Sequence, residues 1–161
     1  MLLSIISPTY NEAKNIEKFV ELIESCLNSY EYEIIFVDDN STDKTHEIVK
    51  KIAYKKTNVR CIRRIGRRGL SSAVIEGCLS SSSDLLLIID SDLQHDEKKI
   101  PIMINTLQKE NLELVIASRF LNHNKVLGLT KYRNALSQFA NFLANTISRA
   151  NLTDPMSGFF L

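Results

Sequence analysis

This sequence has almost no net charge, few cysteines and no long hydrophobic run, and each shortage excludes a class of protein. The 161 residues carry a formal net charge of +1, so no global positive charge indicates a nucleic-acid partner. The longest uninterrupted apolar run is Leu85–Ile89, which is far too short to cross a bilayer. Any contact with a membrane is therefore expected to be peripheral or to pass through sequence outside this chain.

The cysteines do not form the pattern of a disulfide framework or a metal site. There are three of them, Cys26, Cys61 and Cys78, and no two have the spacing of metal ligands. We interpret them as reduced, partly buried thiols, which predicts a reducing compartment such as the cytoplasm. The apolar start, Met1–Ile6, lacks the basic region of a signal peptide and is better interpreted as a first strand.

Strand and helix patterns alternate along a chain that is 44% apolar, enough for a sizeable core. Such alternation predicts an α/β fold, with a mostly parallel sheet flanked by helices in a single domain. Periodicity predicts helices that start near residues 16, 48, 70, 100 and 136. The expected strands are Leu2–Ser7, which Pro8 would end, Glu33–Val37, Val59–Ile62, Leu85–Ile89 and Leu114–Ala117.

Two acidic clusters directly follow the two most apolar strands. Asp38 and Asp39 follow one, and Asp90 and Asp92 follow the other. The carboxyl ends of parallel strands share one edge of the sheet, so both clusters should lie on that edge. If the segment after Asp90 is extended, Asp90, Asp92 and Gln94 point the same way and offer the oxygen ligands that Mg²⁺ or Mn²⁺ prefers. The alternative is that Asp90 and Asp92 merely end a strand and cap the next helix.

Two other features have both a structural and a functional interpretation. A dense basic run between Arg60 and Arg68 is either a solvated loop or a surface that attracts anionic lipid headgroups. The apolar stripe between Leu136 and Ile147 is either core packing or a membrane-surface helix. His95, a lone histidine beside a turn, is left out of the predicted metal site.

Six segments in this order resemble family 2 glycosyltransferases with the GT-A (Rossmann-like) fold. The likeness is strongest to the branch that acts on polyprenol phosphates, which includes the dolichol-phosphate mannosyltransferases. It covers essentially the whole chain, so we expect residues 1–161 to be a GT-A domain, truncated at its C-terminus. The segments are Pro8–Glu12, Val37–Asp43, Asp90–His95, Ala117–Phe120, Arg133–Ser137 and Asp154–Phe159.

The resemblance implies roles for particular residues. Asp92, Arg119 and Arg133 would be catalytic, and Asp90, Asp92 and Gln94 would hold the metal. Arg119, Arg133 and Ser137 would bind the acceptor phosphate, because guanidinium groups match phosphate oxygens in bidentate geometry. The nucleotide-sugar donor would be bound by Pro8, Tyr10, Glu12, Val37, Asp39, Asp90, Ser91, Asp92, Gln94 and Arg119.

The implied reaction is an inverting, metal-dependent transfer of mannose or glucose to a polyprenyl or dolichyl phosphate. GDP-mannose and UDP-glucose both fit as donors, and the protein would lie at the cytoplasmic face of a membrane. One alternative is a saccharide hydroxyl acceptor, which requires a general base, for which Asp154 is the candidate. Another is an inactive nucleotide-binding fragment. A nucleotidyltransferase is not supported, because no glycine-rich loop lies near Pro8.

Overall fold

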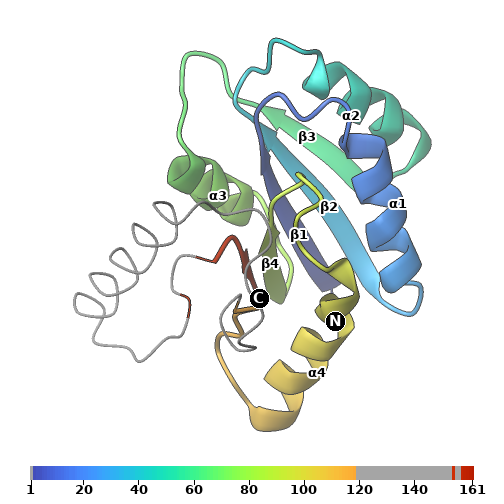
Figure 1. The fold of residues 1–161 in the computed structure, drawn as a ribbon, viewed down its shortest axis with the longest axis vertical. Coiled ribbons are helices and arrows are strands. Elements are labelled where there is room, and N and C mark those ends of the chain that lie inside the picture. The colour runs from blue at the N-terminus through green and yellow to red at the C-terminus, as the bar shows by residue number, and fades with distance from the viewer. Residues whose placement is uncertain (1, 119–153, 155–156) are drawn as a thin grey trace, which may run out of the picture.

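A five-stranded sheet forms the centre of the protein. The computed structural model describes residues 2–118, 154 and 157–161. The strands lie in the order β3-β2-β1-β4-β5 (Figure 1). The first four strands along the chain are parallel, and only β5 is antiparallel to its neighbour β4. The predicted mostly parallel sheet is therefore confirmed. The strands are β1 (Leu2–Thr9), β2 (Glu31–Asp38), β3 (Val59–Arg63), β4 (Leu85–Ile89) and β5 (Phe159–Phe160).

Helices cover both faces of this sheet, as the alternation predicted. One face packs against α1, α2 and α4 and contains the larger part of the core, including the edge-to-face pair Phe19 and Phe36. The other face packs against α3, whose Ala73 contacts Ile6, Val37 and neighbouring apolar side chains. Figure 1 shows α3 on the opposite side of the sheet from α1 and α2. The bounds are α1 (Ile16–Cys26), α2 (Thr45–Lys55), α3 (Leu70–Leu79), the short 3-10 helix η1 (Glu97–Lys99) and α4 (Ile100–Glu110).

Strand β1 runs through Pro8 instead of stopping before it. Its pairing with β4 ends at Ile6, whereas its pairing with β2 continues to Thr9 opposite Asp38. Pro8 lacks an amide donor, but it lies beyond the last residue paired with β4. The strand therefore continues on its β2 side and carries Pro8 and Thr9 to the carboxyl edge of the sheet.

The region predicted as a strand at Leu114–Ala117 pairs with the end of the chain. Ile116 forms an isolated antiparallel bridge with Phe160, and Val115 and Leu161 exchange two backbone hydrogen bonds of 2.8 and 2.9 Å. β5, which the sequence patterns did not predict as a strand, lies between this segment and β4. The apolar stripe from Leu136 to Ile147 lies outside the described residues.

Within the part of the chain that the structure describes, no helix is both long and apolar enough to span a membrane.

Candidate functional site

The two acidic clusters both lie at the carboxyl edge of the sheet, where the sequence predicted them. Asp38 is the last residue of β2, and Asp90 follows the end of β4. Two cavities at this edge share Pro8 and Leu70 as wall residues, one of them reaching Asp39 and the other Asp90. The strands that carry the clusters flank β1 on either side, so the clusters are neighbours across one strand.

Asp38 and Asp39 are adjacent in sequence but have different surroundings. Asp38 is fully buried and accepts hydrogen bonds from the amide and hydroxyl of Ser41, so it stabilises the turn that follows β2. Asp39 lies closer to the surface, with 8% of its area exposed. Its backbone amide donates to the Thr9 carbonyl at 3.0 Å and extends the β1–β2 pairing by one bond. Asp38 is therefore a structural residue, and only Asp39 faces a cavity.

The Asp39 carboxylate is held by Arg64 and by the start of α3. One of its oxygens accepts from the Arg64 guanidinium at 2.8 Å, and the other accepts from the Gly69 amide at 2.8 Å. Gly69 precedes α3 and has a φ of 134°, a conformation that L side chains rarely adopt. The positive end of the helix dipole also favours a carboxylate at this place. Arg64 and the Gly69 amide thus hold the Asp39 carboxylate in one orientation.

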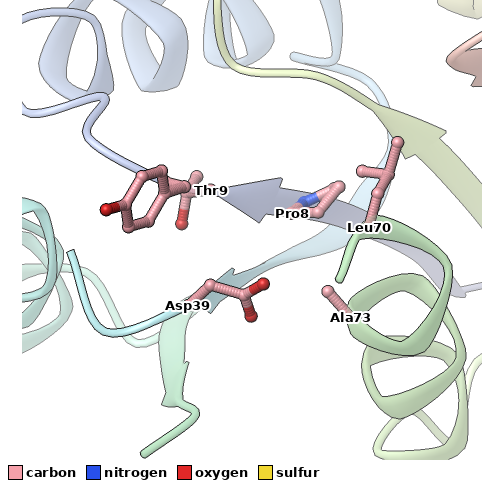
Figure 2. Close-up of a pocket in the computed structure, with 6 residues that line it drawn as sticks. Pro8, Thr9, Asp39, Leu70 and Ala73 are labelled. Carbon is pink, nitrogen blue, oxygen red and sulfur yellow. The ribbon is translucent and has the colours of Figure 1, made fainter. Parts of the chain in front are cut away.

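A cavity of about 130 Å³ lies beside Asp39. It is lined by Pro8, Thr9, Tyr10, Asp39, Leu70 and Ala73, and Figure 2 shows the carboxylate at the end of β2 pointing toward the start of α3. Tyr10 is 44% exposed, and the Arg68 guanidinium lies 4.6 Å from the centre of its ring. An aromatic ring beside a carboxylate suits a flat ring that carries N–H or O–H donors, and the neighbouring cation suits an anionic group attached to that ring.

Other predicted donor residues are divided between this cavity and the core. The Val37 side chain is fully buried beneath α3, so only its backbone faces the sheet edge. Glu12 is half-buried, and its carboxylate accepts from the Asn15 side chain at 2.7 Å. The structure therefore places Pro8, Tyr10 and Asp39 together at the cavity, whereas it does not place the Val37 side chain there.

The loops after β1 and β2 are bound to one another by side-chain hydrogen bonds. The Asn11 side chain accepts from the Thr42 amide at 2.9 Å, and Ser41 accepts from the Asn11 amide at 2.9 Å. Asp43 accepts from the Ala13 amide and from Thr45. Burial acts to raise the pKa of Asp43, but the hydrogen bonds from Thr45 and Ala13 outweigh it and hold the pKa below its ordinary value. These bonds join the loop after β1, which begins at Tyr10, to the loop after β2.

The segment after β4 forms a turn and is not extended over its whole length. Leu93 has a left-handed φ of 62°, and the Gln94 amide donates to the Asp92 carboxylate at 3.0 Å. The expected extended segment therefore breaks at Leu93, before Gln94, whose side chain is exposed. The alternative that Asp90 and Asp92 cap the next helix is wrong, because Asp96 and Lys99 occupy the cap positions of η1 and α4.

Two carboxylates at this turn suit a divalent cation that also binds a ligand. Among the described residues, no group of three or more acidic, histidine or cysteine side chains could hold a metal ion. Mg²⁺ is commonly bound through one or two carboxylates plus the phosphates of a substrate, so Asp90 and Asp92 fit that kind of site. The His95 Nε2 lies 3.9 Å from the Asp90 carboxylate. Within the described structure the buried Ser91 hydroxyl has no hydrogen-bond partner.

Gly158 lets the end of the chain pass directly against Asp90. A Cβ at this glycine would lie 2.6 Å from the Asp90 Oδ2 atom. Gly158 and Ser157 also line a second cavity, of about 350 Å³, which reaches Asp90. Any residue larger than glycine would push the Asp90 side chain aside, so Gly158 helps to set the position of this carboxylate.

The basic run does not form one charged surface. Arg64 is only 2% exposed, and besides Asp39 it contacts Ser72 and Glu76. Arg60 pairs with Glu33 at 2.8 Å, and Arg67 pairs with Glu76 at 2.8 Å. The expectation that all of these arginines face solvent or lipid headgroups is therefore wrong for Arg64. Its guanidinium contacts buried or partly buried partners within the protein.

Some contacts of the candidate site were not predicted, and some predicted site residues lie outside the described residues. The contacts of Arg64 and Gly69 with Asp39 and of Gly158 with Asp90 were not predicted, because an arginine within a basic run and single glycines carry no local signal of a distant partner. Asp154 is fully buried. The predicted phosphate-binding residues Arg119, Arg133 and Ser137 lie outside the described residues, so their roles stay predictions.

Comparison with known sequences gives one family and a consistent set of relatives. Residues 4–161 match the family described as glycosyl transferase family 2. A dolichol-phosphate mannosyltransferase of Pyrococcus furiosus is 38% identical over 162 residues, which cover 99% of this chain and 46% of that protein. The Saccharomyces cerevisiae protein of the same name is 35% identical over 98% of this chain and 59% of its own length. The chain thus spans about half the length of these relatives.

Solved structures show the same fold. A mannosyltransferase from Pyrobaculum calidifontis, solved in complex with GDP-Man and Mn²⁺, is 26% identical and has a TM-score of 0.57 over 65% of this chain and 32% of its own. A glucosyl-3-phosphoglycerate synthase from Mycobacterium tuberculosis, 21% identical, has a TM-score of 0.71 over 99% of this chain and 55% of its own. At this identity the second likeness concerns the fold alone.

Proposed function

This chain belongs to glycosyl transferase family 2, and on that premise we propose that it transfers a hexose to a polyprenyl or dolichyl phosphate. The donor is a nucleotide-diphosphate sugar, and the sugar is transferred with inversion. The observation that carries this proposal is the pair of cavities at one sheet edge that share Pro8 and Leu70 as wall residues. One contains Asp39 and the exposed ring of Tyr10, and the other reaches the carboxylate of Asp90.

The donor nucleoside is assigned to the cavity beside Asp39. Pro8 and Tyr10 offer apolar and aromatic surface, and Asp39 accepts hydrogen bonds from the base or ribose. Arg64 and the Gly69 amide hold the Asp39 carboxylate in place, so the acceptor atoms are oriented before the donor arrives. Glu12 and the Val37 backbone complete the same side. GDP-mannose is the preferred donor, since the named relatives are mannosyltransferases.

The donor diphosphate is assigned to the turn after β4, together with a divalent cation. Asp90 and Asp92 would be the protein ligands of that cation, with Ser91 and Gln94 in the same turn, and the donor phosphates would supply further oxygen ligands. Bound Mg²⁺ or Mn²⁺ supplies Lewis-acid neutralisation of the diphosphate leaving group. A structure related at 26% identity contains GDP-Man and Mn²⁺, which supports a divalent cation in this role.

The acceptor phosphate is assigned to Arg119, Arg133 and Ser137. A phosphate is already anionic at neutral pH, so it attacks the anomeric carbon without a strong general base. The two guanidinium groups would balance the charge of this phosphate. Because its acceptor is a lipid, the protein acts at the cytoplasmic surface of a membrane. A saccharide acceptor is less well supported, because its candidate base Asp154 is fully buried.

A transfer assay tests the proposal directly. The full-length gene product is incubated with Mn²⁺, a short polyprenyl phosphate and labelled GDP-mannose or UDP-glucose. We expect label in the lipid, with GDP-mannose preferred over UDP-glucose. Arg133→Ala should lower that transfer at least about tenfold, the rate equivalent of 1.4 kcal/mol. Arg133→Lys should restore it only in part, since an ammonium cannot form the bidentate fork.

Binding of the free nucleotide provides the control for this assay. Arg133→Ala should leave the affinity for GDP or UDP nearly unchanged, because that affinity depends on Asp39 and the metal. Undiminished transfer by Arg133→Ala would remove Arg133 from the acceptor site. Transfer to a free sugar hydroxyl that depends on Asp154 and not on Arg133 would establish the saccharide acceptor in its place.

A further inference from the structure

The second cavity at the sheet edge has walls that suit a hydrocarbon better than a sugar. Its volume is about 350 Å³, and α3, β4 and β5 contribute to its lining. Leu70, Val74, Ile75, Ile88 and Phe160 supply most of that lining. A sugar ring needs several polar partners to replace its lost hydrogen bonds to water, and these side chains provide none.

The polar groups of this cavity are few and already engaged. The Ser157 hydroxyl donates to the Ala117 carbonyl at 3.0 Å and accepts from the Phe159 amide at 3.2 Å. Asp90 belongs to the proposed metal site, which leaves Ser71 as the remaining polar side chain of the lining. An apolar occupant therefore satisfies this cavity, whose lining reaches the carboxylate of Asp90.

The apolar surface continues away from Asp90 along the outside of α3. Leu70, Ile75 and Leu79 are 62%, 59% and 82% exposed. Large apolar side chains gathered at this exposure commonly mark a contact surface. Ile75 and Leu79 are four residues apart, so they lie on one face of the helix. Ile75 lines both this cavity and a neighbouring groove that contains Leu79, so the two adjoin at Ile75. That groove is also lined by Ser72, Glu76 and three arginines.

We propose that this cavity and the α3 face bind the first isoprene units of the acceptor lipid. The occupant is the hydrocarbon chain of a prenyl phosphate whose phosphate lies on the side of Asp90. This assignment rests on the proposed function, because it presumes a lipid-linked acceptor. It adds a chain-binding subsite on α3 to the phosphate-binding residues, and it explains why apolar side chains are exposed next to a polar reaction centre.

Binding as a function of chain length tests the subsite without requiring catalysis. Methyl, isopentenyl, geranyl and farnesyl phosphates are titrated into the full chain by calorimetry, below their micelle concentrations. Each added isoprene unit should lower Kd by about tenfold, because every buried methylene contributes favourably to binding. Ile75→Gln should reduce this gain below about threefold per unit. Ser71→Phe, which fills the cavity with an apolar group, should reduce the gain as well.

A matched variant separates the subsite from a general effect of surface polarity. Ile102 is 63% exposed on α4, on the opposite face of the sheet, and Ile102→Gln should keep the parent's dependence on chain length. Affinity for methyl phosphate should be the same in all four proteins. An unchanged dependence in Ile75→Gln and Ser71→Phe, or no dependence in the parent, overturns the subsite.

The two proposals fail in different ways. If the parent protein transfers sugar equally well to prenyl phosphates of every length, the proposed function stands and the subsite is wrong. If the parent protein binds longer prenyl phosphates more tightly, in a way that depends on Ile75, but transfers no sugar, the subsite stands and the proposed function is wrong.

Discussion

At the scale of single residues, Arg64 shows how a buried charge organises this site. Its guanidinium lies between the Asp39 carboxylate at 2.8 Å and the Ser72 hydroxyl at 2.6 Å, and it is almost wholly shielded from water. Taking an arginine out of water is unfavourable unless its partners are well placed. Here those partners are Asp39, which lines the proposed nucleoside cavity, and the first turn of α3, so one side chain joins the candidate site to the fold.

Removing Arg64 should therefore destabilise the protein strongly. Arg64→Ala leaves the Asp39 carboxylate buried beside a void, and breaking such a pair costs about 3–5 kcal/mol. Arg67→Ala removes a neighbouring arginine whose side chain is 60% exposed, and surface pairs contribute at most about 1 kcal/mol. Urea denaturation of the two variants measures the difference. Equal losses of unfolding free energy in the two variants would show that the buried Arg64 contributes no more to stability than the exposed Arg67.

At the scale of elements, α3 connects the cavities to the sheet. It begins at Gly69, whose amide binds Asp39, and its face toward the sheet carries Ala73 and Gly77. A Cβ at Gly77 would lie 2.3 Å from the Ile6 Cγ2 atom and 3.0 Å from the Val37 Cγ2 atom. Both of these side chains are buried in parallel strands, so the close approach of α3 depends on the absence of a side chain at this position.

Gly77→Ala should consequently destabilise the fold, although alanine is the better helix former. Overpacking costs about 3 kcal/mol at the upper end, and the gain in helix propensity offsets about 1 kcal/mol, which leaves a net loss of about 2 kcal/mol. Ser71→Ala on the exposed side of the same helix should change stability by no more than about 0.5 kcal/mol. Chemical denaturation compares them. If Gly77→Ala is as stable as the parent, α3 can shift away from the sheet without loss of stability.

At the scale of the whole molecule, the parallel sheet brings distant sequence segments to one edge. Asp39 follows β2 and Asp90 follows β4, and β1 lies between these strands. The loops after β1 and β2 are joined by hydrogen bonds, including Asn11 to Thr42. A ligand that spans the edge from Asp39 to Asp90 therefore contacts several elements at once, and its binding should stabilise the entire fold.

Nucleotide and metal should stabilise the protein jointly. With GDP or UDP at about a hundred times its Kd and Mn²⁺ present, the expected gain is about 2.7 kcal/mol, measured as a rise in thermal midpoint. Asp92→Asn should lose most of the Mn²⁺-dependent part, because it removes one of two anionic ligands. Asp84→Asn, an exposed residue in the loop before β4, serves as the control. Equal stabilisation by nucleotide with and without metal would disprove the site at Asp90 and Asp92.

The sequence by itself determined the architecture and the edge on which the site lies. Apolar periodicity reports which face of each element is buried, and it predicted the parallel strands and the helices between them. Because parallel strands end at one edge, the positions of Asp39 and Asp90 after their strands were enough to bring them together. The ordered motifs resembled one enzyme family, and residues 4–161 match that family.

Only the tertiary structure decided which side chains pair across that edge. Arg64 and Asp39 are separated by 25 residues, and nothing in the run of arginines distinguishes the one that is buried. The same holds for Gly158 against Asp90, for the turn at Leu93 and for the pairing of β5 with β4. The physical reason is that a local pattern describes an element's own burial, whereas the partner of a charge or a close backbone contact is set by segments that meet only when the chain folds.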